Sequence, residues 1–213
     1  MKLKEKIIIL GTGGTSLDIL DLIFELDHQC AGFLDDNKSL YGKSINGIEI
    51  IGSLSEALNY KDTYFINGIG SPSNFLQKEK IITSTNIPRE RFLTLIHPSA
   101  SISKTATLGV GSVIFQNVVI SSNAKIGNHV VILPNSVISH DDEIGDYACI
   151  ASGVCISGLV KVGKLCYLGT GSLVKEGVSI GDKSLVGMGS VVLNDIEKSS
   201  VYAGNPAKFL RPS

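Results

Sequence analysis

The chain has 213 residues, of which 43% are hydrophobic, and its formal net charge is −1. A length of this order suits one large domain or two small ones, each with a packed core. The balanced charge excludes the simplest class of nucleic-acid-binding protein, which needs a basic surface. We expect no membrane span, because no run of about 18 apolar residues occurs. The apolar run after the charged N-terminus is too short for a signal peptide.

The placement of the cysteines indicates a reducing compartment. The chain contains Cys30, Cys149, Cys155 and Cys166, and none of them form a CxxC spacing. This pattern is typical of reduced thiols, and it predicts neither a disulfide framework nor a zinc site. We therefore expect a cytoplasmic protein.

The first half of the N-terminal segment, residues 1–95, opens with a strand and a helix. Residues 7–10 predict a short buried strand, and a glycine-rich turn follows at 11–16. The apolar residues that then recur at helical spacing are Leu17, Leu20 and Phe24. A second strand is expected at 30–34.

The second half of the segment continues the same alternation. Ser53 and Glu56 form a capping box, which predicts the start of a short helix. Residues 64–66 predict a third strand, and Ser71 with Pro72 predicts the opening of another helix. Residues 1–95 are therefore predicted to form an α/β domain with a small parallel βαβαβ sheet.

The glycine-rich turn is placed where a strand meets a helix. There, backbone N–H groups and a helix N-terminus can face a phosphate. Asp35 and Asp36 end the second strand, where an acid can hold a ribose or a base. The dinucleotide fingerprint is incomplete, because Ser16 stands at its last glycine position. A mononucleotide or a nucleotide-linked sugar therefore fits better than NAD, and a purely structural turn is the alternative.

From residue 96 onward the sequence repeats every six residues. One position of the unit is always aliphatic, the position two places before it is mostly small, and glycine often follows it. The aliphatic residues are Ile96, Ile102, Leu108, Ile114, Ile120, Ile126, Ile132, Ile138, Ile144, Ile150, Ile156, Val162, Leu168, Val174, Ile180, Val186 and Val192. The small residues include Ala100, Ala106, Ser112, Ala124, Ser136, Ala148, Cys166, Ser172, Ser184 and Ser190. The glycines are Gly109, Gly127, Gly145, Gly163 and Gly181.

This period predicts a three-sided prism. Each unit makes one short strand and one turn, and three units close one coil, with the aliphatic side chains stacked inside. We expect the glycines to supply the backbone angles of the turns. Such a solenoid satisfies its own sheet hydrogen bonds and exposes flat faces. An ordinary β-sandwich is the alternative, but its strands do not keep one period through their turns.

The repeat is similar to that of the hexapeptide-repeat acyltransferases, whose prism is a left-handed parallel β-helix. With the α/β domain in front, the whole chain resembles the sugar acetyltransferases of the sialic-acid and bacillosamine (NeuD/PglD-like) type. The segments that carry the resemblance are the GxGG turn at Gly11, Phe33-Leu34-Asp35-Asp36, Ile96-His97-Pro98, Ser139-His140-Asp141 and Gly204-Asn205-Pro206-Ala207-Lys208. It implies a nucleotide-sugar-binding domain over 1–95 and an acetyl-CoA-binding left-handed β-helix with a C-terminal tail over 96–213. It also implies a homotrimer with intersubunit active sites.

His140 is the candidate catalytic base. Attack of an amine on a thioester requires loss of the amine's proton, which a histidine can accept. A neighbouring carboxylate, here Asp141, can fix the tautomer of the histidine. Asp142 also breaks the repeat by standing at a small-residue position, which hints at function. A histidine on a solvated turn is the alternative, and the resemblance places the base at His140 and its partner at Asp141.

The resemblance also implies the residues that contact acetyl-CoA. They are Cys149, Gly158, Thr170 and Met188, with Lys208 available to the CoA phosphates as a point charge. Many relatives have histidine where Cys149 stands. We expect Cys149 to be buried and inert, because no cation next to it in the sequence would activate it.

The resemblance places the sugar nucleotide on the first domain. Its phosphates would lie on Gly13, Gly14 and Thr15, and its base or ribose at Asp35, Asp36 and near Gly70. Many relatives have histidine at Thr15. Departures of this kind leave the nucleobase and the sugar open.

Hexapeptide prisms also include metal enzymes that use three converging histidines. His97, His129 and His140 are the candidates here, but each falls at a different place in its unit. Different places point in different directions, so no metal site is expected.

The resemblance implies a cytoplasmic enzyme of glycan biosynthesis. It would transfer acetyl from acetyl-CoA to the amine of a nucleotide-linked 4-amino deoxysugar by direct attack, without a metal or a covalent intermediate. One alternative is a sialic acid O-acetyltransferase, which would leave the glycine-rich turn without a clear use. The other is a non-catalytic sugar-nucleotide-binding protein.

Overall fold

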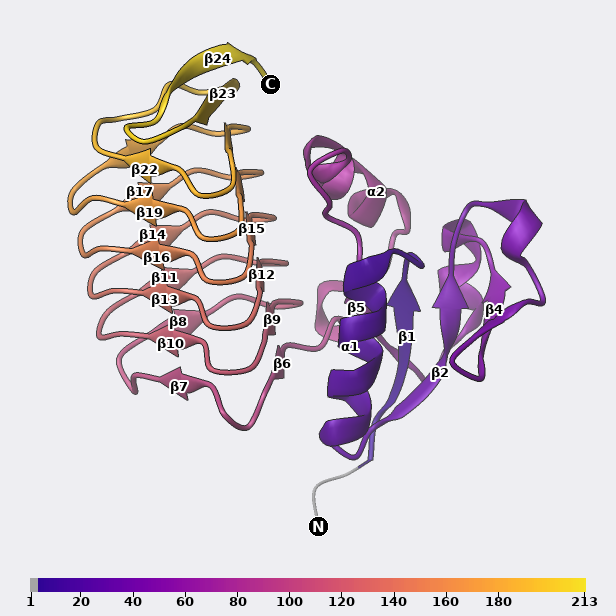
Figure 1. The fold of residues 1–213 in the computed structure, drawn as a ribbon. Helices are drawn as coiled ribbons and strands as arrows, with labels where there is room; N and C mark the ends of the chain where they lie inside the picture. Colours follow the sequence, from indigo (N-terminus) through magenta and orange to yellow (C-terminus); the bar gives the residue numbers. More distant parts are fainter. Residues whose placement is uncertain (1–3) are drawn as a thin grey trace.

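A computed structural model of the protein describes residues 4–213 and shows an α/β domain beside a left-handed parallel β-helix (Figure 1). The α/β domain is built on a five-stranded sheet in the order β3-β4-β2-β1-β5. Its strands are β1 (Lys6–Leu10), β2 (Gln29–Leu34), β3 (Ser44–Ile45), β4 (Ile48–Gly52) and β5 (Tyr64–Asn67). Neighbouring strands are parallel except for β3 and β4, which form an antiparallel pair that the sequence pattern did not predict.

Helix α1 (Gly14–Glu25) packs on this sheet, but of the three apolar residues in the predicted stripe only Leu20 is fully buried. The residues it buries are Ser16, Ile19, Leu20, Leu22 and Ile23. Phe24 is instead 48% exposed. The helix has more apolar residues than one face can hold, so apolar spacing alone does not fix which face is buried.

The remaining helical segments are short. Helix α2 (Lys78–Ser84) begins later than predicted, because Asn74 first accepts a hydrogen bond from the Ser71 amide at 2.7 Å and holds a turn there. The capping box at Ser53 is present, with the Ser53 amide 2.6 Å from Glu56 Oε2, but it opens a 3-10 helix. The 3-10 segments are η1 (Lys38–Leu40), η2 (Leu54–Asn59), η3 (Phe75–Gln77) and η4 (Arg89–Arg91).

The predicted prism is confirmed. Its short strands form three parallel sheets, and adjacent strands of a sheet are 18 residues apart in the chain. They are β6 (Leu95–Ile96), β7 (Ser101–Ile102), β8 (Thr107–Leu108), β9 (Val113–Ile114), β10 (Val119–Ile120), β11 (Lys125–Ile126), β12 (Val131–Ile132), β13 (Val137–Ile138), β14 (Glu143–Ile144), β15 (Cys149–Ile150), β16 (Cys155–Ile156), β17 (Lys161–Val162), β18 (Tyr167–Leu168), β19 (Leu173–Val174), β20 (Ser179–Ile180), β21 (Leu185–Val186) and β22 (Val191–Val192). An antiparallel hairpin, β23 (Ser200–Ala203) and β24 (Lys208–Pro212), closes the end of the prism.

The aliphatic column forms the prism core, as predicted, from Ile114 to Val192. The first coil is less well covered, because no coil lies beneath it. Ile102 and Leu108 are only partly buried there, and Ile96 is 37% exposed. Burial in the prism therefore depends on a coil on each side, which is the expected behaviour of a solenoid.

The role predicted for the repeat glycines is wrong. From Leu108 to Val186, a positive φ angle occurs three places after each aliphatic residue of the column, at Gly111, Asn117, Asn123, His129, Asn135, Asp141, Tyr147, Gly153, Leu159, Leu165, Gly171, Gly177, Lys183 and Gly189. The glycines that directly follow an aliphatic residue serve a steric need instead. A Cβ added at Gly109, Gly127, Gly145, Gly163 or Gly181 would lie between 2.3 and 2.6 Å from the next coil.

The two domains share a hydrophobic interface. Leu95, Val113 and Val131, on the outer face of the sheet that contains β6, β9 and β12, pack in one cluster with Ile7 and Phe33 of the α/β domain. One of the three prism faces is therefore covered by the α/β domain (Figure 1). Within residues 4–213, no helix is both long enough and apolar enough to cross a membrane.

Candidate active site

The glycine-rich turn borders a cavity of about 300 Å³ at the carboxyl ends of β1, β2 and β5. Its lining residues are Gly11, Thr12, Gly13, Gly14, Thr15, Asp35, Asp36, Leu54, Gly68, Ile69, Gly70, Ser71, Asn74 and Ile81. Gly13 precedes α1, whose N-terminus has no side-chain cap. A Cβ added at Gly13 or Gly14 would meet no atom within 4 Å. Packing therefore does not require these two glycines, and their lack of a side chain leaves the backbone N–H groups open to a ligand.

The two acids of this cavity already have protein partners. Asp35 accepts a hydrogen bond from the Thr12 hydroxyl at 2.6 Å and another from the Asn37 amide at 2.9 Å. Asp36 accepts one from the Leu54 amide at 3.0 Å. Each carboxylate retains acceptor sites, so a role in binding ribose or base stays a prediction.

A second cavity, of about 220 Å³, lies between the two domains. It shares with the first cavity the residues Gly14, Thr15, Ile69, Gly70 and Ser71. Its opposite wall is the prism sheet, including Leu133, Cys149 and Tyr167. A ligand bound at the glycine-rich turn can therefore extend toward the prism.

Cys149 is buried, as predicted, and no cation is next to it in the sequence, but the fold brings one into contact with it. Lys78, at the start of α2, is fully buried and donates a hydrogen bond from Nζ to the Cys149 sulfur at 3.5 Å. Burial lowers the pKa of Lys78, and the adjacent Cys149 opposes that change. These residues are 71 positions apart, so no local pattern could have revealed the pair.

The predicted catalytic pair is formed on an exposed corner between β13 and β14. His140 Nδ1 lies 2.9 Å from Asp141 Oδ2, and their side chains are 57% and 42% exposed. The hydrogen bond to Asp141 raises the pKa of His140, with further contributions from the charges of Asp141, Glu176 and Asp142. The imidazole lies against Gly158, where an added Cβ would be 2.6 Å from Nε2.

Two further residues support this corner. Asn123, one coil earlier, donates a hydrogen bond from Nδ2 to Asp141 Oδ1 at 3.0 Å. The bonds to His140 and Asn123 lower the pKa of Asp141. The sequence analysis missed Asn123, although its position 18 residues before Asp141 could have identified it. Asp142 is fully buried, and burial raises its pKa to about 7.

One chain does not bring the predicted acetyl-CoA residues together. Gly158 lies with His140 at the corner between β16 and β17. Thr170 and Met188 lie at the corner beside β19 and β22, where Thr170 accepts a backbone hydrogen bond from Gly189 at 2.8 Å and Met188 is 76% exposed. Cys149 faces the α/β domain, and Lys208 begins β24. Their role in binding CoA stays a prediction.

The other histidines have structural contacts. His97 Nε2 pairs with Glu25 at 2.5 Å and joins the end of α1 to the first coil. His129 stacks on Tyr147 at 5.3 Å, and burial lowers its pKa to about 4. No group of three or more metal-ligating side chains is present in the part of the chain that the structure describes.

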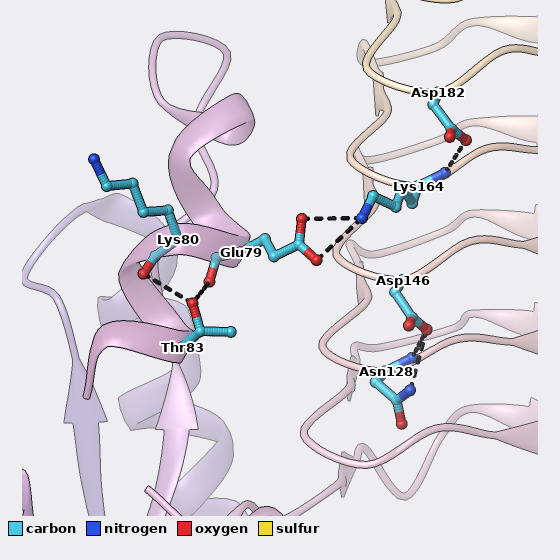
Figure 2. A network of polar contacts seen from close by, with 7 residues as sticks. All are labelled: Glu79, Lys80, Thr83, Asn128, Asp146, Lys164 and Asp182. Carbon is cyan, nitrogen blue, oxygen red and sulfur yellow. Dashed lines mark hydrogen bonds and ion pairs between the residues drawn. The ribbon is translucent and has the colours of Figure 1, made fainter. Parts of the chain in front are cut away.

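A polar contact also joins α2 to the prism. Glu79 on α2 pairs with Lys164 on the facing corner, with both carboxylate oxygens 3.1 Å from Nζ (Figure 2). The Lys164 amide in turn donates to Asp182, and Asp146 accepts from the Asn128 amide one coil apart (Figure 2). Only the Glu79–Lys164 pair involves α2, and it lies next in sequence to Lys78, whose partner Cys149 lines the interdomain cavity.

Two family models match the chain, one over the prism and one over the α/β domain. Residues 94–204 match the family model of the GMPPB C-terminal domain, and residues 6–81 match that of the PglD N-terminal domain. No curated protein sequence matches the chain significantly.

Several solved structures share the whole fold. PerB from Caulobacter crescentus, in complex with CoA and GDP-perosamine, is 25% identical with a TM-score of 0.86, and the match covers 96% of this chain and 97% of PerB. The acetyltransferase domain of PglB from Neisseria gonorrhoeae FA1090, in complex with acetyl coenzyme A, is 26% identical with a TM-score of 0.86, covering 98% and 100%. WeeI from Acinetobacter baumannii AYE is 24% identical with a TM-score of 0.84, covering 97% and 100%, and shows the shared fold.

The α/β domain followed by a left-handed β-helix is the fold of hexapeptide-repeat acetyltransferases, which are the structural neighbours of this chain. The chain belongs to the sugar acetyltransferases of the sialic-acid and bacillosamine (NeuD/PglD-like) type, with a prism of the GMPPB C-terminal domain family. It is an acetyl-CoA-dependent sugar N-acetyltransferase, as the family resemblance implied.

Proposed function

We propose that the protein transfers the acetyl group of acetyl-CoA to the amine of a nucleotide-linked 4-amino deoxysugar, with His140 as the general base. The observation that carries the proposal is the His140–Asp141 pair, which lies exposed on a chain that also has an open glycine-lined cavity. The complex of PerB with CoA and GDP-perosamine supports this substrate class.

The reaction needs few groups from the protein. The amine loses a proton to Nε2 of His140 as it attacks the thioester carbonyl, and the CoA thiolate leaves. Asp141 holds Nδ1, so that Nε2 is the free nitrogen, and it stabilises the imidazolium that forms. No covalent enzyme intermediate is needed.

We further propose that each active site lies between two copies in a homotrimer. The sheet containing β15 faces the α/β domain (Figure 1). His140 lies between β13 and β14, which belong to the other two sheets. A sugar bound in the interdomain cavity of one chain therefore needs His140 from another. The sheet beside His140 also exposes Val119 and Leu173, at 37% and 45%, which suits contact with another copy.

The first test is release of the CoA thiol from acetyl-CoA in the presence of UDP-, GDP- and dTDP-linked 4-amino sugars. We expect one acceptor class to support turnover, and His140→Ala to reduce it by about 10²-fold or more. His28→Ala is the matched control, since His28 lines neither cavity. If His140→Ala keeps the wild-type turnover, His140 is not the general base.

A complementation test addresses the intersubunit site. Gly14→Glu should block the nucleotide cavity without a clash in the fold, because no atom lies within 4 Å of the added Cβ. Coexpression of the His140→Ala and Gly14→Glu chains should restore part of the activity. In a mixed oligomer, some sites combine the intact nucleotide cavity of the His140→Ala chain with the intact His140 of the Gly14→Glu chain. An absence of recovery in purified mixed oligomers would place the whole site in one chain.

A further inference from the structure

Asp142 departs from the repeat in a way that the proposed chemistry leaves unexplained. Asp142 stands two places before the aliphatic residue of its unit. From Ala100 to Ser190, all the remaining units carry Ala, Ser, Val or Cys at that position. Asp142 has no exposed surface, and it is the only carboxylate among the buried polar residues of the region 4–213. A buried carboxylate costs free energy unless hydrogen bonds compensate for its lost hydration.

Both carboxylate oxygens of Asp142 accept hydrogen bonds from backbone amides. Oδ2 accepts from the Ser139 amide at 2.8 Å, and Oδ1 accepts from the Val160 amide at 2.9 Å. Ser139 and Asp142 are the two ends of the turn that carries His140 and Asp141 at its tip. The carboxylate therefore closes this turn and ties it to the next coil.

Only one of these two bonds belongs to the ordinary repeat. Ser112 stands at the equivalent place of another unit, and its hydroxyl accepts from the Val130 amide, 18 residues later, at 3.0 Å. The Val160 bond is the counterpart of that contact. The bond to Ser139 has no such counterpart, and it requires the second oxygen that only an acid supplies.

The bond to Ser139 also changes the strand ladder at this coil. The Ser139 amide lies 3.2 Å from the Ile156 carbonyl, because it is shared with Asp142. The matching ladder bonds of the same column, donated by Ser103, Ser121, Ser157 and Lys175, are 2.8 to 3.0 Å long. The ladder hydrogen bond of Ser139 is thus longer than its counterparts, and the same amide also holds the turn through Asp142.

His140 needs a backbone constraint, because packing does not supply one. Its side chain is 57% exposed, its hydrogen-bond partner is Asp141, and its ring lies over Gly158, where an added Cβ would be 2.6 Å from Nε2. Its carbonyl accepts from the Leu159 amide at 3.0 Å, one residue before the Val160 amide that Asp142 holds. The turn and the facing corner are therefore locked together on both sides of the imidazole.

We infer that Asp142 is a positioning residue, which fixes the His140 turn so that Nε2 faces the acceptor amine. This inference rests on the proposed role of His140 as the base. A small displacement of a catalytic group can cost about 10²-fold in rate. On this inference, the buried carboxylate of Asp142 serves the reaction, and the stability of the fold does not require it.

The decisive variant is Asp142→Ser. Serine occurs at this place in other units, so the fold tolerates it, and its hydroxyl can restore the bond to Val160 in the manner of Ser112. It cannot also reach the Ser139 amide. We expect kcat to fall about tenfold or more, with the KM for acetyl-CoA unchanged and the Tm equal to or above that of the wild type.

Ser112→Ala is the matched control, because it removes the same coil-to-coil bond at a corner remote from His140. It should lower the Tm and leave kcat unchanged. A titration of the His140 ring by NMR gives a readout apart from turnover. In Asp142→Ser the pKa of His140 should move toward its ordinary value, because the charge of Asp142 is lost and the bond to Asp141 weakens as the turn loosens.

Three results separate this inference from the proposed function. If His140→Ala is inactive and Asp142→Ser keeps the wild-type kcat, the base stands and the positioning role is overturned. If His140→Ala stays active, both the assignment of His140 as the base and the positioning role of Asp142 are overturned. The third result comes from the double variant His140→Ala/Asp142→Ser. If it is no slower than His140→Ala alone, Asp142 acts through His140, as inferred. A further loss of rate in the double variant would overturn the positioning role.

Discussion

His140 Nδ1 and Asp141 Oδ2 lie 2.9 Å apart on a corner of the prism that is open to solvent. Such exposure leaves the hydrogen bond as the main determinant of how readily the imidazole takes a proton. Because this bond raises the pKa of His140, the fraction of the ring that is neutral and able to act as a base increases only at higher pH.

The pH dependence of Asp141→Asn follows from this bond. The rate should rise with pH as His140 loses its proton, and the variant should shift that rise to lower pH, because the pKa of His140 is no longer raised. At neutral pH, kcat should still fall, by up to about 10²-fold, since the tautomer is no longer fixed. A pH profile of kcat/KM checks both effects, and an unshifted profile would show that Asp141 does not set the pKa of His140.

Asp142 should make the protein less stable as the pH rises. Burial raises the pKa of Asp142 to about 7 in the folded state, whereas an exposed aspartate titrates near 3.8. Between these values the folded state binds one proton more than the unfolded state, so the free energy of unfolding decreases with pH. The loss is complete above pH 7 and amounts to at most about 4 kcal/mol.

Urea denaturation of the wild type and of Asp142→Ser between pH 4 and pH 8 tests this. The stability of the variant relative to the wild type should grow across the range. A constant difference would mean that Asp142 titrates outside it. This measurement needs no substrate, so it is independent of the positioning role.

The period of the sequence predicts the prism because it reports a property of every unit. One inward aliphatic side chain per strand is required whatever the remote contacts are. The α/β domain was harder to predict, since α1 has apolar residues on more than one face and its burial depends on the sheet beside it. Phe24 is exposed for this reason, and the β3–β4 pair has strands too short to show a pattern.

The same distinction applies to the site. His140, Asp141 and the anomaly at Asp142 are adjacent in sequence, and the glycine-rich turn is a local motif. Asn123 is predictable only once coils are stacked at 18 residues. Lys78 reaches Cys149 because the two domains dock, and docking depends on the shapes of two folded surfaces and not on any local pattern.

The Glu79–Lys164 pair should contribute little to stability. Its side chains are 37% and 42% exposed, so water and salt screen their attraction. Lys164→Met, which keeps most of the alkyl chain, should change the Tm by no more than about 3 °C, and Glu79→Gln should behave alike. Calorimetry at low and high salt is the measurement. A larger drop that persists in high salt would indicate that the pair orders α2 as a whole.

Lys78 and Cys149 should respond unequally to substitution. Lys78 is fully buried, and the Cys149 sulfur is its side chain's hydrogen-bond partner. Cys149→Ala would leave the amine buried without an acceptor and should lower the free energy of unfolding by about 2 kcal/mol. Lys78→Met removes the buried amine altogether, so the stability should stay the same or increase.

A double-mutant cycle isolates the coupling between these two residues. Lys78→Met should suppress most of the cost of Cys149→Ala, because the orphaned amine is then absent. Chemical denaturation of the four proteins gives the coupling free energy directly. Equal, additive losses from the two single variants would mean that the pair is merely packed, and that the amine finds other partners when the thiol is removed.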